Sequence, residues 1–136
     1  MSFEWQHFLE LAQDLVNSHG DGTDGDADPE TREAALRTAV SRAYYAAYHA
    51  VREYVSATGR GDPPRGDSHT WVWNQLDPRQ RRQEGQMKRE GFKLLKTRKS
   101  ADYDLDSVGN WTKQAKFDVD TSRTILKLVA DIQPKT

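Results

Sequence analysis

Apolar residues recur at helical spacing in three long stretches of this chain, with polar residues on the opposite faces. One stretch runs from Phe3 to Asn17, another from Pro29 to about Ala57, and the last from Trp111 to Ile132. Side chains three or four residues apart share one face of an α-helix, so each stretch predicts an amphipathic helix. The central stripe is the longest and is rich in alanine, comprising Leu36, Ala39, Val40, Ala43, Ala47, Ala50, Val51 and Tyr54. Short side chains let helix axes approach, so a closely packed neighbour is expected.

Turn-forming residues divide the rest of the chain. Residues 19–28 form an acidic, glycine-rich loop, expected to be flexible, and residues 58–67 form a second loop rich in glycine and proline. Asp28 is a typical helix N-cap residue, and Pro29 is typical of the first position of a helix. A short helix is expected from Ser68 through Leu76, a fourth helix towards Lys99, and irregular chain over residues 101–109. No stretch has the alternation of a strand, so the 136 residues predict a single all-α domain of four to five helices.

Composition narrows the classes of protein to consider. The chain has no cysteine, which excludes disulfides, thiolate metal sites and cysteine nucleophiles. No apolar run approaches the length of a membrane span, and the first residues lack a secretory pattern. We therefore expect a cytoplasmic protein with no membrane association.

Charge is distributed unevenly although the net charge is only −1. Residues 1–34 carry nine acids and one base, whereas residues 79–99 carry nine bases and two acids. The basic run is either a nucleic-acid footprint or an ordinary solvated helix face. For the first interpretation, the candidate RNA contacts are Lys96, Arg98 and Lys99, together with Arg52 of the central helix.

The central helix also carries the candidate chemistry. Arg42 and His49 are seven residues apart, about 20° short of two full turns, so they share one stripe with Tyr45 between them. Arginine can fork onto a phosphate, imidazole titrates near neutrality, and a tyrosine can orient either group or stack on a base. These are the requirements of metal-independent RNA cleavage, in which the 2′-hydroxyl attacks the neighbouring phosphate. The alternative is that Arg42 and His49 only flank a buried helix.

The spacing of this pair adds a constraint. Seven residues separate the two backbone positions by about 10.5 Å along the axis, and both side chains lean in the same direction. One copy therefore holds the two groups too far apart to act jointly on one phosphate. Two such helices crossing about a two-fold axis would bring Arg42 of one chain towards His49 of the other. We predict a composite site in a homodimer and an inactive monomer.

Other kinds of site find little support in the sequence. No two histidines have the spacing of zinc ligands, and the acids of residues 19–28 do not fall at the positions of a calcium loop. Phosphate-binding glycine loops and nucleophile elbows are also absent. We expect no metal and no cofactor. His69 is interpreted as a residue of a helix N-terminus, and Tyr44 and Tyr48 as core or interface aromatics.

Three segments in order resemble the HEPN family of small α-helical domains. Residues 42–49 (RAYYAAYH) resemble its signature of arginine, four to six residues, then histidine. Asp67-Ser-His69 is similar to a recurrent histidine at the head of the next helix, and residues 98–104 (RKSADYD) to the Arg, then Ala-Asp-Tyr segment of one branch. The resemblance implies an up-and-down bundle that dimerises through the signature helices. Many active members have a polar residue directly after the signature arginine, where this chain has Ala43.

These observations lead to one expected function and two alternatives. The resemblance implies a metal-independent endoribonuclease, a toxin or defence component, whose catalytic residues are Arg42, Tyr45 and His49 and whose product is a 2′,3′-cyclic phosphate. An antitoxin or a nucleotidyltransferase is then a possible partner. The first alternative is a non-catalytic HEPN binding module that partners a nucleotidyltransferase or a larger complex, and the second is a structural subunit of a larger complex. Ala43 and the low net charge favour both alternatives.

Overall fold

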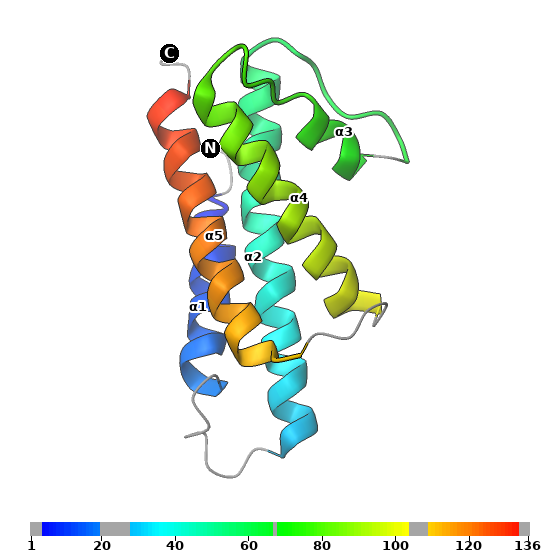
Figure 1. Ribbon diagram of the computed structural model, residues 1–136, viewed down its shortest axis with the longest axis vertical. Helices are drawn as coiled ribbons and strands as arrows, with labels where there is room; N and C mark the ends of the chain where they lie inside the picture. The colour runs from blue at the N-terminus through cyan, green and yellow to red at the C-terminus, as the bar shows by residue number, and fades with distance from the viewer. Residues whose placement is uncertain (1–3, 20–27, 67, 104–108, 134–136) are drawn as a thin grey trace.

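Five helices make up the regular structure of the residues that the computed structural model describes, which are 4–19, 28–66, 68–103 and 109–133. They are α1 (Gln6–His19), α2 (Pro29–Ala57), α3 (Ser68–Asn74), α4 (Arg82–Tyr103) and α5 (Trp111–Ile132). The four long helices lie side by side and alternate in direction, and short α3 lies beside one end of α2 and α4 (Figure 1). The prediction of an all-α bundle is confirmed.

Local sequence accounts for the N-terminal ends of α2 and α5. The Asp28 side chain accepts a hydrogen bond from the Thr31 amide at 2.7 Å, so α2 begins at Pro29 as predicted. Asn110 caps α5 in the same way through the Lys113 amide. α1 covers Gln6–His19 rather than beginning at Phe3, which lies outside the described residues, as do residues 20–27 and Asp67.

One predicted boundary is wrong. Residues 101–103, expected to be irregular, are the last residues of α4, while residues 104–108 lie outside the described part of the chain. The Asp102 carboxylate lies 3.3 Å from the Arg98 guanidinium, one turn earlier. This pairing and the burial of Ala101 stabilise an additional helical turn that the sequence pattern did not indicate.

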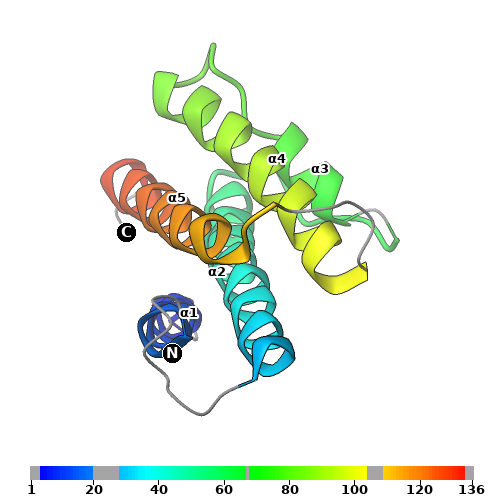
Figure 2. The ribbon, with the colours of Figure 1, turned by 60° about the horizontal axis from the view of Figure 1, so that its bottom comes forward.

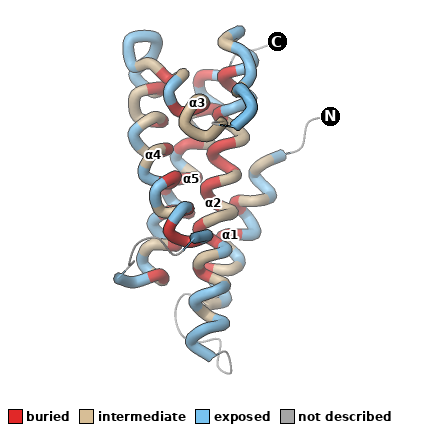
Figure 3. The backbone as a smooth tube through the Cα atoms, turned by 90° about the vertical axis from the view of Figure 1, so that its right-hand side faces the viewer, coloured by how far each residue is buried: buried red, intermediate tan, exposed pale blue. Residues whose placement is uncertain are grey.

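The core is built around α2, which packs against each of the other helices. Figure 2 shows α1, α4 and α5 arranged around it. Along the tube in Figure 3, buried positions follow the sides of the helices that face one another. Ala39, Ala43 and Ala47 are fully buried, and the Ser122 hydroxyl of α5 donates to the Ala43 carbonyl at 2.7 Å. The alanines of α2 therefore do permit close helix packing, as the sequence indicated.

Helix α3 is held by one large side chain. Trp73 is fully buried and packs over Gly91 of α4, where a Cβ atom would lie 2.3 Å from the ring carbons. Its indole N–H donates to the Tyr44 hydroxyl of α2 at 3.1 Å. This contact ties α3 to both neighbours and places His69, near the start of α3, beside α2.

The loop between α2 and α3 is anchored by a buried carboxylate. Glu84 of α4 accepts two hydrogen bonds of 2.7 Å from the Arg60 guanidinium, one of 2.9 Å from the Asp77 amide, and one from the Tyr54 hydroxyl. Arg60, which begins the first of two Arg-Gly-Asp tripeptides, therefore has a structural role in the loop. Within the described ranges, no helix is long and apolar enough to cross a membrane.

Candidate active site

The predicted catalytic residues lie along one margin of α2. Arg42, Tyr45 and His49 are each partly exposed, and Arg52, one turn further, is exposed. The positions between them point into the core, including fully buried Ala43 and Tyr44. Neither Arg42 nor His49 is enclosed in the core, so both polar groups are accessible, as contact with an RNA phosphate would require.

His49 is held between aromatic rings. Its imidazole stacks on the Trp5 indole, with ring centroids 4.0 Å apart and planes 17° apart. Tyr48 approaches edge-on at 5.0 Å, and the Tyr45 ring is stacked at 6.0 Å. Burial of the ring, followed by the positive charge of Arg52 and the proximity of His69, lowers the pKa of His49 below its ordinary value of 6.5. At neutral pH the ring is therefore uncharged and able to accept a proton.

A second histidine, His69 of α3, lies in the same cluster. Its ring centroid is 4.4 Å from that of Tyr48, and its Nδ1 atom lies 2.7 Å from the Tyr44 hydroxyl. That hydroxyl already accepts from Trp73 and is fully buried, so its own proton needs an acceptor. The Tyr44 hydroxyl therefore donates to Nδ1, and in neutral His69 the proton is on Nε2. Burial raises the pKa of Tyr44 well above its ordinary value, so the phenol stays neutral.

The sequence pattern indicated no part in the site for His69, and the structure places it in the aromatic cluster of His49, where Tyr48 contacts both rings. Its placement depends on the packing of Trp73 against Gly91, a contact between two helices that no spacing within one helix reveals. The sequence feature that could have indicated a role for His69 was the Asp67-Ser-His69 segment at the start of a short helix. Tyr44 and Tyr48 are buried, in agreement with their interpretation as core aromatics.

Arg98 was expected among exposed bases that contact RNA, but the structure buries it. Only 6% of the residue is exposed, and its guanidinium lies over Tyr44 and Tyr45 at 5.3 and 5.7 Å from the ring centroids. Within the described ranges its Nε atom has no hydrogen-bond partner. Arg98 is therefore a cation inside the aromatic cluster rather than part of the exposed basic face, because its turn of α4 packs onto α2.

The two other α4 candidates, Lys96 and Lys99, are exposed. Neither of them lines the hollow that His49 faces or the hollow that Arg42 faces. The structure does not bring them together with His49. That Lys96 and Lys99 contact RNA remains a prediction, and it concerns a surface that is separate from the α2 margin.

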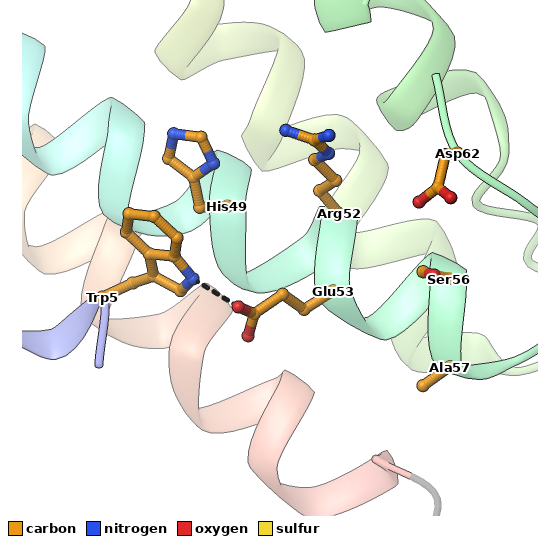
Figure 4. A pocket seen from close by; sticks show the side chains of 7 residues that line it. All are labelled: Trp5, His49, Arg52, Glu53, Ser56, Ala57 and Asp62. Atoms are coloured by element: carbon orange, nitrogen blue, oxygen red, sulfur yellow. Dashed lines mark hydrogen bonds between the residues drawn. The ribbon is translucent and has the colours of Figure 1, made fainter. Parts of the chain in front are cut away.

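Arg42 and His49 line different hollows. Arg42 lies over the Phe8 ring at 5.4 Å and faces a hollow of about 490 Å³ shared with Tyr45, Ser41 and Asp102. His49 faces a hollow of about 410 Å³ shared with Arg52 (Figure 4). The separation agrees with the helical geometry, so one chain alone does not direct both groups at a single phosphate.

No group of three or more His, Asp or Glu side chains in the described ranges is arranged to hold a metal ion. No protein-family model matches the chain, and neither a curated protein nor a solved structure matches it. The resemblance to HEPN domains thus remains a prediction from the three sequence segments.

Proposed function

We propose that this protein is a metal-independent endoribonuclease of the HEPN type that acts as a homodimer. The observation that carries the proposal is the His49 imidazole, uncharged at neutral pH and facing a hollow beside exposed Arg52. A neutral imidazole can remove the proton from an RNA 2′-hydroxyl. Arg52 can hold the phosphate nearby without changing its charge.

The remaining requirements point to a second copy of the chain. An arginine is needed where negative charge builds up on the phosphate, and an acid must protonate the leaving 5′-oxygen. Arg42 is suited to the first role but lies two turns from His49 and faces another hollow. Pairing two α2 margins about a two-fold axis would supply Arg42 and a second imidazole from the partner chain.

The test is cleavage of a mixed-sequence RNA by the purified dimer in excess EDTA. We expect products that end in a 2′,3′-cyclic phosphate and a loss of at least about 100-fold in rate for His49→Ala and for Arg42→Ala. His7→Ala and Arg89→Ala are matched controls, since both residues are exposed on other helices. Variants of Arg42 and His49 that cut as fast as the parent would refute the assignment.

Two further outcomes address the composite site and the biological role. Mixing Arg42→Ala with His49→Ala chains should restore part of the activity, because the mixed dimer retains one site that combines Arg42 of one chain with His49 of the other and lacks only the second imidazole. A toxin should arrest growth when expressed, and His49→Ala should relieve that arrest.

One observation favours the non-catalytic alternative. The Trp5 indole covers a face of the His49 ring, which limits access to it. If the dimer binds RNA but does not cut it, and Trp5→Leu does not release activity, a binding module is the better description.

A further inference from the structure

The hollow next to His49 has an aromatic wall whose position is firmly held. Trp5, just before α1, stacks on His49 and donates its indole N–H to the Glu53 carboxylate at 2.9 Å. Phe8 also lies against it, with ring centroids 5.6 Å apart. The indole is thus positioned by three contacts although it is only partly buried. Such fixed aromatic rings are the surfaces on which single-stranded nucleic acids stack their bases.

The hollow carries one positively charged and two negatively charged side chains, Arg52, Glu53 and Asp62. Figure 4 shows the two rings at one side and Asp62 at the other, with Arg52 and Glu53 between them. Arg52 forms no ion pair with any described residue. One oxygen of Glu53 is used by Trp5, whereas its other oxygen and the exposed Asp62 carboxylate have no hydrogen-bond partner in the described ranges.

This arrangement orients a nucleotide. The two carboxylates repel a phosphate, so a phosphate is accepted only at the Arg52 side, close to His49. The base then lies against Trp5, next to Glu53, and faces Asp62 across the hollow. Carboxylates accept hydrogen bonds, and the bases that offer an exocyclic amino group are adenine, cytosine and guanine. Uracil has no amino group: it offers two carbonyl oxygens, which the carboxylates disfavour, and a single ring N–H donor.

We propose that this hollow is a nucleobase subsite that prefers amino-bearing bases over uracil, with Trp5 as its stacking surface and Glu53 and Asp62 as its specificity-determining residues. The proposal deepens the proposed function, since it states which nucleotide would lie beside His49. It also makes a statement about binding that does not require the protein to cut RNA.

Binding of the four 3′-nucleoside monophosphates tests the proposal. The indole N–H resonance of Trp5, identified by its loss in Trp5→Leu, should shift on addition of 3′-AMP, 3′-CMP or 3′-GMP. Affinity for 3′-UMP, measured by calorimetry, should be weaker by about tenfold. An unchanged Trp5 resonance with all four nucleotides, or equal affinity for 3′-UMP and 3′-CMP, would overturn the proposal.

Variants separate stacking from base selection. Trp5→Leu should weaken the binding of all the amino-bearing nucleotides. Asp62→Asn and Glu53→Gln should instead reduce the preference for these nucleotides over 3′-UMP. Asp62 lies in a loop, so its replacement does not endanger folding. Asp14→Asn, an exposed carboxylate on α1, should leave affinity and preference unchanged. A preference over 3′-UMP that persists in both carboxylate variants would contradict their assigned role.

The outcomes distinguish this proposal from the ribonuclease proposal. Selective nucleotide binding without RNA cleavage would support the subsite and refute the enzyme. RNA cleavage that depends on His49, with no nucleotide preference and no response of Trp5, would support the enzyme and refute the subsite.

Discussion

Replacing one buried carboxylate should make the stability of this protein markedly less dependent on pH. Asp118 of α5 is 1% exposed. Its Oδ1 atom accepts from the Gln114 amide at 2.8 Å, and its Oδ2 atom has no hydrogen-bond partner in the described ranges. Burial raises the pKa of Asp118 from an ordinary 3.8 to about 7, because the charged form loses its hydration.

The sign and size of the effect follow from proton linkage. The native state binds this proton more tightly than the unfolded chain does. The stability that protonated Asp118 contributes is therefore lost as pH rises from about 4 to about 7 and changes no further above that. A pKa difference of about three units corresponds to about 4 kcal/mol in total. Asparagine keeps the acceptor for Gln114 and carries no charge. At each pH, the effect of Asp118→Asn is its free energy of unfolding minus that of the parent. This effect should be more favourable at pH 8 than at pH 5 by about 2.5 kcal/mol.

Urea unfolding followed by circular dichroism at the two pH values measures this difference. Asp120→Asn is the matched control, because Asp120 is exposed and, among the described residues, forms an ion pair only with Arg123 at the surface. The control should change stability by less than about 0.5 kcal/mol at both pH values. An equal effect of Asp118→Asn at pH 5 and pH 8 would show that the Asp118 carboxyl does not titrate between them, and the reasoning from burial would fail.

Two further perturbations test the packing and the electrostatics of the site. Gly91→Ala should destabilise the protein by about 2 kcal/mol in urea unfolding, since the new Cβ overlaps the buried Trp73 ring and the cost exceeds the gain in helix propensity. Gly109→Ala, where nothing lies within 4 Å of the added atom, should cost nothing, and equal stability of the two variants would contradict the packing argument. Arg52→Gln should raise the pKa of His49 towards 6.5 in an NMR titration by removing a nearby positive charge, whereas Arg52→Lys should not. A pKa of His49 that is the same in both variants would remove Arg52 from the explanation.

The helices and the stripe of candidate site residues on α2 were predictable because both depend on local periodicity. Every residue of a helix has a defined angular position, so Arg42, Tyr45 and His49 had to share a stripe beside the buried alanines. The start of α2 was equally local, since Asp28 caps the helix through a residue three positions away.

Periodicity does not say which neighbour covers a given stripe, and that is where the sequence was insufficient. Trp5 reaches the His49 region from 44 positions away, and the Tyr44 hydroxyl meets His69 across 25 positions, both through contacts between helices. Arg98 belongs by sequence to a basic run, yet the turn of α4 that carries it packs over Tyr44 and Tyr45. Helical spacing determined which residues share a face, whereas the packing of large side chains such as Trp73 decided which faces meet, because such contacts depend on the shapes of several helices at once.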